Sequence, residues 1–134
     1  MLKQLSIFAE NKKGTMEDIT RILLENNVNI LGSVINDSAE YGIIRMVVSD
    51  TKKAMDAFHA HGYICKMTDV LGIEVKDEVG NLNKLLRALL DSNINADYLY
   101  LSFNRDTGMP IMIIHTADIM EVEECLRSKG FTSL

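Results

Sequence analysis

An internal repeat is the feature that most constrains how this sequence can fold. Identical residues fall on one another when the sequence is shifted by 66 residues: Gly14 on Gly80, Asn29 on Asn95, and Leu23-Leu24 on Leu89-Leu90. Toward the end of each copy the shift becomes 68 residues. Matches this dense at one spacing indicate a duplication. We therefore predict two domains, residues 1–69 and 70–134, with no Gly-rich, Ser-rich or Pro-rich linker between them.

Hydrophobic periodicity gives both halves the order strand-helix-strand-strand-helix-strand. The first half has predicted strands over residues 4–9, 28–36, 43–48 and 63–69, with a turn at 37–40. The second half has predicted strands over residues 71–75, 94–104, from 110 onward, and, shortened, 131–134. The predicted helices have side chains suited to capping at their starts, namely Thr15, Asp50, Asn81 and Asp118.

This order of elements predicts an α+β fold made of two ferredoxin-like domains, each with both helices on one face of an antiparallel sheet. The second strand of each domain then lies at a sheet edge, and an exposed edge tends to pair with another strand. We expect residues 30–36 to pair with residues 96–103, which would place the two domains side by side in one eight-stranded antiparallel sheet.

Composition excludes several classes of protein. The 134 residues carry a net charge of −5, which argues against a nucleic-acid partner because such surfaces need a basic stripe. No apolar run approaches the roughly 18 residues of a membrane span, and the N-terminus lacks a signal-peptide pattern. Cys65 and Cys125 lack motif spacing, so we interpret them as buried thiols and expect a cytoplasmic location.

The loop Glu10-Asn11-Lys12-Lys13-Gly14 is the candidate binding motif, and it recurs as Lys76-Asp77-Glu78-Val79-Gly80. Each copy precedes a predicted helix, whose N-terminal N–H groups and dipole favour a carboxylate or phosphate. We expect Asn11 and Asn29 to converge at this end of the first domain. Two other readings remain open, since Asn11 could cap the turn and Asn29 could be a left-handed residue after the helix.

Catalytic, metal and cofactor sites are not predicted. His59, His61 and His115 have no evident partners in the sequence, and we find no nucleophile–base pair, metal-ligand cluster or phosphate-binding loop. We therefore expect a protein without enzymatic activity.

The repeated loop and the strand that follows it resemble the ACT domain, a small amino-acid-binding module of metabolic regulation. Glu10-Asn11-Lys12-Lys13-Gly14 is similar to the loop of the serine-binding ACT domain of phosphoglycerate dehydrogenase, and Val28-Asn29-Ile30 to its second-strand entry. The family's loop proline is replaced by Lys13 and Val79. The resemblance covers essentially the whole chain, once per repeat.

The resemblance implies a regulatory or sensor protein that binds an amino acid or a similar small metabolite. The implied ligand-binding residues are Asn11, Lys13, Gly14, Thr15, Asn29, Ile30, Asp77, Gly80, Asn81 and Asn95. We rank the first repeat above the second because the Asn11 amide both donates and accepts hydrogen bonds, whereas the Asp77 carboxylate only accepts. The alternative is a ligand-free interaction module that docks on a metabolic enzyme.

The assembly that we expect is a homodimer. Tyr98 and Tyr100 fall on the sheet face opposite the predicted helices. Exposed aromatic side chains of this kind often mark an interface.

Overall fold

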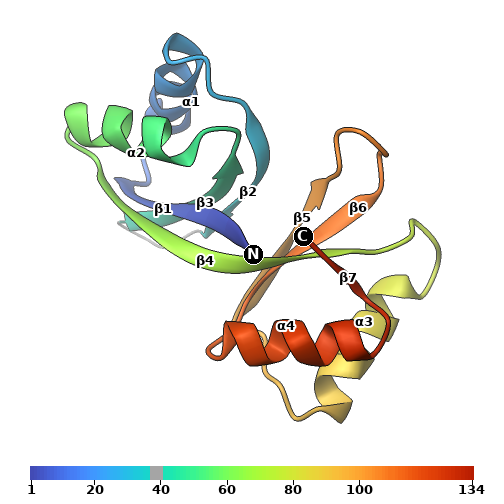
Figure 1. Ribbon diagram of the computed structural model, residues 1–134. Coiled ribbons are helices and arrows are strands. Elements are labelled where there is room, and N and C mark those ends of the chain that lie inside the picture. Colours follow the sequence, from blue (N-terminus) through green and yellow to red (C-terminus); the bar gives the residue numbers. More distant parts are fainter. Residues whose placement is uncertain (37–40) are drawn as a thin grey trace. The chain divides into compact units, whose positions relative to one another are not determined.

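The computed structural model describes residues 1–36 and 41–134, so the predicted turn at 37–40 lies outside the described residues. The described residues form four α-helices and seven β-strands (Figure 1). Their order is β1 (Leu2–Glu10), α1 (Thr15–Glu25), β2 (Ile30–Asn36), β3 (Tyr41–Val48), α2 (Thr51–Ala60), β4 (Ile64–Glu74), α3 (Asn81–Asp91), β5 (Tyr98–Phe103), β6 (Pro110–His115), α4 (Ile119–Ser128) and β7 (Thr132–Ser133). The α+β class is therefore confirmed.

The chain divides into two compact units. The N-terminal unit comprises residues 3–68, and the C-terminal unit comprises residues 69–134 together with residues 1–2. The strand order is β2-β3-β1-β4 in the first unit and β5-β6-β4 in the second, where β7 also pairs with β4. Strand β4 passes through the boundary and contributes to both units.

The prediction of eight strands is wrong in the described residues. The last strand of the first repeat and the first strand of the second are one continuous strand of eleven residues, β4. The physical reason is visible in the sequence, because Thr68-Asp69-Val70 leads into Leu71 without a Gly or Pro that would end a strand.

The predicted pairing of residues 30–36 with residues 96–103 is also wrong. Strand β2 pairs with β3, with Ile35 opposite Ile44, and β5 pairs with β6. Because β4 is shared, β2 and β5 fall at the two ends of the strand order.

An apolar core forms in each unit between the helices and one face of the strands. In the N-terminal unit Ile19, Ile22 and Leu23 form a buried apolar stripe on α1, and the ring of Phe58 from α2 is fully buried beside it. In the C-terminal unit Leu85 and Leu89 of α3 and Leu126 of α4 occupy the corresponding positions. Cys65 is buried as expected, whereas Cys125 is only half-buried and its thiol donates to Ser92 Oγ at 3.3 Å.

The sheet face that was expected to expose two tyrosines does not do so. Tyr100 is only 6% exposed. Tyr98 is half-buried, and its ring stacks on the imidazole of His115 with centroids 4.9 Å apart. The stacking follows from the register, which places Tyr98 opposite His115. The reasoning from exposed tyrosines to a homodimer is therefore wrong.

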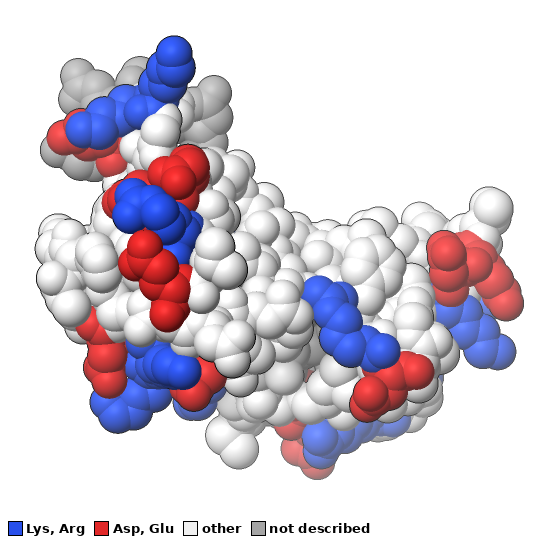
Figure 2. Space-filling view, turned by 90° about the horizontal axis from the view of Figure 1, so that it is seen from above, with Lys and Arg blue, Asp and Glu red and all other residues white. Residues whose placement is uncertain are grey.

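Charge on the surface is mixed rather than segregated. On the face drawn in Figure 2, Lys and Arg side chains lie among Asp and Glu side chains, and the described residues there form no broad basic area. None of the described helices is both long enough and apolar enough to cross a membrane.

We predict that the two equivalent core positions both carry large stability contributions. Phe58→Ala should lower the free energy of unfolding by about 3–5 kcal/mol, and Leu126→Ala by about 2–5 kcal/mol, because each leaves a cavity in a packed core. Leu24→Ala is the control, since Leu24 is 77% exposed and should change stability by less than about 0.5 kcal/mol. Urea denaturation of the three variants measures these differences. A loss below about 1 kcal/mol at either core position would contradict the core assignment.

Candidate functional site

The two copies of the candidate loop have the same backbone structure. Gly14 and Gly80 precede α1 and α3 with φ of 90° and 88°, a left-handed conformation that favours glycine. The hydrogen bonds inside the loops also match: Lys12 N–H to Glu10 C=O at 3.0 Å and Glu78 N–H to Lys76 C=O at 2.9 Å. The duplication has therefore preserved this loop in three dimensions.

The predicted capping by Thr15 and Asn81 is wrong, and the difference concerns the candidate site. Both residues are the first residue of their helix and turn back toward the loop. Thr15 Oγ1 donates to the Glu10 carbonyl at 2.9 Å, and Asn81 Nδ2 donates to the Lys76 carbonyl at 2.9 Å. Their side chains therefore close the loop, and the N-termini of α1 and α3 lack a side-chain cap.

The other two predicted caps differ from each other. Asp50 caps α2 as predicted, because its carboxylate accepts from the Lys53 N–H at 3.1 Å. Asp118 stands at the start of α4 but makes no side-chain capping hydrogen bond, so that prediction is wrong.

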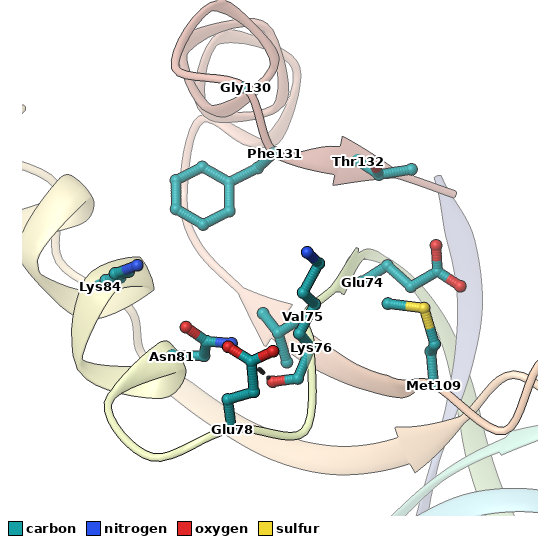
Figure 3. Close-up of a pocket in the computed structure, with 10 residues that line it drawn as sticks. All are labelled: Glu74, Val75, Lys76, Glu78, Asn81, Lys84, Met109, Gly130, Phe131 and Thr132. Carbon is teal, nitrogen blue, oxygen red and sulfur yellow. Dashed lines mark hydrogen bonds between the residues drawn. The ribbon is translucent and has the colours of Figure 1, made fainter.

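Each loop borders a cavity, and the two cavities are lined by corresponding residues of the two repeats. The C-terminal pocket has a volume of about 400 Å³ and is lined by Glu74, Val75, Lys76, Glu78, Asn81, Lys84, Met109, Gly130, Phe131 and Thr132 (Figure 3). The N-terminal pocket has a volume of about 300 Å³ and is lined by Phe8, Ala9, Glu10, Lys12, Thr15, Gly62, Tyr63 and Ile64. Each of these eight residues corresponds to a lining residue of the C-terminal pocket at the shift of the repeat.

In the N-terminal pocket the polar groups are bound to one another. The Tyr63 hydroxyl donates to the carboxylate of Asp18, which also pairs with Arg21. Burial raises the pKa of Tyr63 to about 12, and the hydrogen bond to Asp18 contributes to the rise. The same hydrogen bond is the main cause that holds the pKa of Asp18 below its usual value, and Arg21 adds to it. Lys12 pairs with Glu10 at 3.3 Å.

The C-terminal pocket has different side chains at the corresponding positions. Phe131 replaces Tyr63 and carries no hydroxyl, and Lys84 replaces Asp18. In the described part of the chain, the side chains of Lys76, Glu78 and Lys84 form no ion pair. This pocket therefore presents charges of both signs that are free to meet a ligand.

Asn29 and Asn95 lie away from the loops. Strands β1 and β2 are both antiparallel to β3, so they are parallel to each other, and the loop after β1 lies at the opposite end from the start of β2. The β3 residues that pair with these two ends, Tyr41 and Val48, are seven positions apart, or roughly 23 Å at about 3.3 Å per residue. The expected convergence of Asn11 and Asn29 is therefore wrong, and the same geometry separates Asn95 from the loop of the C-terminal unit.

The two displaced asparagines have other surroundings. The backbone of Asn29 bonds to Ser49, through N–H to Oγ at 2.9 Å and through its carbonyl to the Ser49 N–H at 2.9 Å. Asn95 lines a separate cavity of about 420 Å³ at the other end of the C-terminal unit, where its carbonyl accepts from Thr116 Oγ1 at 3.2 Å.

The other expected site residues are divided between lining positions and exposed positions. Asn11 lines a small cavity of about 40 Å³. Lys13 and Asp77 are exposed in the loops, and Ile30 begins β2 opposite Val48. Sequence reasoning missed Lys84, Met109 and Phe131. The repeat offered a signal for Phe131, because Gly62-Tyr63 corresponds to Gly130-Phe131.

The histidines and cysteines have structural partners. His59 contacts the Cys65 carbonyl at 3.2 Å, and His61 contacts the Ala57 carbonyl at 2.8 Å. His115 was expected to lack a partner, but Asp97 lies 2.8 Å from its Nδ1. Burial raises the pKa of the Cys65 thiol to about 11, which disfavours the reactive thiolate. The described residues contain no group of three or more His, Cys, Asp or Glu that could hold a metal ion.

Comparison with known protein families identifies the fold. A family model described as an ACT domain pair matches residues 1–130. This chain belongs to the ACT domain pair family. The match spans both units, so the ACT pair is the duplication seen in the sequence. A comparison with curated proteins gives no match.

Solved structures resemble this ACT pair over nearly its whole length. A protein from Bacteroides thetaiotaomicron is 32% identical, with 99% of this chain and 91% of that chain covered and a TM-score of 0.90. The regulatory subunit of aspartate kinase from Thermus thermophilus, in a ligand-free form, is 14% identical, with 93% and 88% covered and a TM-score of 0.69. The corresponding subunit from Thermus flavus is 15% identical, with 93% and 88% covered and a TM-score of 0.67. At these identities the two kinase subunits show a shared fold alone.

We predict that the Tyr63–Asp18 hydrogen bond makes stability depend on pH at both extremes. Because the pKa of Asp18 is lower in the folded protein than in the unfolded chain, its carboxylate stabilises the fold above about pH 3.9, the ordinary pKa of aspartate. This contribution is lost as the pH falls through the pKa of Asp18 in the folded protein. Because the pKa of Tyr63 is higher in the folded protein than in the unfolded chain, its neutral hydroxyl stabilises the fold below about pH 10, the ordinary pKa of tyrosine. This contribution is lost as the pH rises toward the pKa of Tyr63 in the folded protein. Tyr63→Phe should therefore melt below wild type near neutral pH, and the difference should shrink below about pH 4 and above about pH 10.

Thermal melts from pH 3 to pH 11 check this expectation. Asp18→Ala breaks the same bond and should give a similar profile. If the difference in melting temperature between Tyr63→Phe and wild type were constant across this pH range, the hydrogen bond would not make stability depend on pH.

Proposed function

We propose that this protein is a non-catalytic regulatory protein that binds an amino acid in its C-terminal pocket. The observation that carries the proposal is the set of unpaired charges around a cavity of about 400 Å³, next to the loop that the family resemblance singled out. A volume of this size is within the range of small-molecule sites. Membership of the ACT domain pair family supports the choice of ligand.

The chemistry of the pocket suits an α-amino acid. Such a ligand carries a carboxylate and an ammonium group side by side and therefore needs both donors and acceptors. The ammonium groups of Lys76 and Lys84 can bind the carboxylate, and the uncapped N-terminus of α3 favours negative charge at the same place. The carboxylates of Glu74 and Glu78 can accept from the ligand ammonium group.

We assign the ligand to the C-terminal unit rather than to the N-terminal unit that the sequence favoured. Gly80 and Asn81 of the expected site belong to its loop and helix start, and Asp77 lies in the loop itself. In the N-terminal pocket the Tyr63–Asp18 bond and the Lys12–Glu10 pair already use the polar groups. A ligand there would have to break these contacts before it could form its own.

A regulatory role draws support from the related structures. The similar protein of Thermus thermophilus is the regulatory subunit of aspartate kinase. Amino-acid binding to the present chain would act by shifting an equilibrium between two states, and the shift equals the difference in affinity for those states. A cytoplasmic location remains a prediction from the sequence.

The first experiment is a thermal-shift screen of the purified chain against the twenty amino acids, followed by titration calorimetry. A ligand at about a hundred times its dissociation constant should add roughly 2.7 kcal/mol of stability. Lys84→Ala should weaken binding about tenfold to a hundredfold, because it removes a charged hydrogen-bond donor from the ligand carboxylate.

Asp18→Ala is the matched control, since Asp18 is the residue of the N-terminal unit that corresponds to Lys84. It should leave the affinity unchanged. Tight binding that Lys84→Ala leaves intact would place the site elsewhere.

A second candidate function, protein interaction, is favoured by an apolar stripe on α3. Leu82, Leu86 and Leu90 are spaced by four residues, lie along one side of the helix, and are 41%, 38% and 66% exposed. The occupant that we propose is a second copy of the chain. A two-fold dimer brings the same surface of both copies together, and a row of leucines can pack against itself as an antiparallel helix pair.

We predict a homodimer in solution that Leu86→Glu converts to a monomer, because the carboxylate would be buried in the interface. Leu24→Glu is the control, since Leu24 corresponds to Leu90 and is also exposed, on α1. Light scattering after size exclusion measures both masses at micromolar concentration. A monomeric wild type would contradict the homodimer and leave docking on a metabolic enzyme as the interaction to test.

A further inference from the structure

We propose that the C-terminal pocket selects neutral α-amino acids with an apolar side chain. This inference rests on the proposed function and narrows its ligand class. It draws on the number of charges in the pocket, on its apolar walls and on the contrast with the N-terminal pocket.

The charges in the pocket match a zwitterion with no further charge. Lys76 and Lys84 provide two positive groups, and Glu74 and Glu78 provide two negative groups. Glu74 is also held by Asn104, whose Nδ2 donates to it at 3.1 Å. The four groups of the pocket and a zwitterion both sum to zero charge. A charged ligand side chain would leave the filled pocket with an uncompensated charge, which costs free energy when that charge loses its water.

Besides the charged groups and the polar residues Asn81 and Thr132, the pocket has an apolar wall whose residues come from three different parts of the C-terminal unit. Val75 follows β4, Met109 precedes β6, and Phe131 lies in the turn before β7. In Figure 3 the ring of Phe131 extends from this turn toward the space beside α3. Met109 is half-buried, and its flexible thioether can adapt to ligand side chains of different shape.

The N-terminal pocket shows what the C-terminal pocket lacks. There the aromatic lining residue is Tyr63, whose hydroxyl donates to the carboxylate of Asp18. Phe131 offers only carbon atoms at the same position. A polar ligand side chain would therefore lose its water at this wall and gain no hydrogen bond, which costs free energy.

Titration calorimetry on the full chain with a defined panel tests this inference. L-leucine, L-methionine and L-phenylalanine should bind at least about tenfold more tightly than L-serine, L-aspartate and L-lysine, the factor expected from burying an apolar side chain. Leucinamide, which lacks the carboxylate charge, and 4-methylpentanoate, which lacks the ammonium group, should each bind more weakly than L-leucine.

Met109→Gln keeps the length of the side chain and places a polar amide in the apolar wall. It should reduce the preference for L-leucine over L-serine by at least about threefold. Tyr63→Phe, which alters only the N-terminal pocket, should leave the preference unchanged.

The outcomes distinguish this inference from the proposed function. Binding of L-serine, L-aspartate or L-lysine as tightly as L-leucine would overturn the apolar preference and leave amino-acid binding standing. If Met109→Gln left the preference for L-leucine over L-serine unchanged, the assignment of Met109 to the wall that selects apolar side chains would be wrong. No binding by any of the twenty amino acids would overturn the proposed function and this inference together.

Discussion

One shared strand determines the arrangement of everything else in this chain. Strand β4 is eleven residues long, and its two halves serve different units. Its backbone groups pair with β1 in the N-terminal unit and with β6 and β7 in the C-terminal unit. This sharing places β1 and β6 next to β4 in the strand order and leaves β2 and β5 at its ends. The two copies of the duplicated domain are thus joined by a strand that they share, without a linker.

The duplication has kept the backbone of the loop and changed its chemistry. In both loops a glycine has the left-handed backbone conformation. In both, the side chain of the first helical residue donates a hydrogen bond to a carbonyl of the loop. The charges at corresponding positions are reversed: Glu10 and Lys76, Lys12 and Glu78, Asp18 and Lys84. In the N-terminal unit Glu10 pairs with Lys12, and Asp18 is bound by Tyr63 and Arg21. In the C-terminal unit, within the described residues, Lys76, Glu78 and Lys84 form no ion pair. A backbone that folds the same way twice has therefore produced two pockets with different ligand requirements.

The sequence predicted what local periodicity controls and failed where geometry over a whole unit decides. Alternation and helical spacing located the helices and both loops. They could not show that β4 continues through the boundary, because two adjacent predicted strands and one long strand have the same pattern of residues. The convergence of Asn11 with Asn29 failed because a helical crossover makes the strands on either side of it parallel, which places the two asparagines at opposite ends of the sheet.

The pocket residues that the sequence missed explain how a ligand in this pocket could act on the fold. Lys84 comes from α3 and Phe131 from the turn before β7, more than forty residues later in the chain. Strand β7 is only two residues long. It pairs with β4 at Ile73 and Glu74, and the Ser133 hydroxyl also donates to Glu123 of α4 at 2.7 Å. A ligand that contacts the loop after β4, the start of α3 and the turn at Phe131 would tie this short strand to the rest of the unit. Elements with few hydrogen bonds open at the lowest free energy. Under the proposed function, the docking of β7 is thus the local equilibrium that the ligand is best placed to shift.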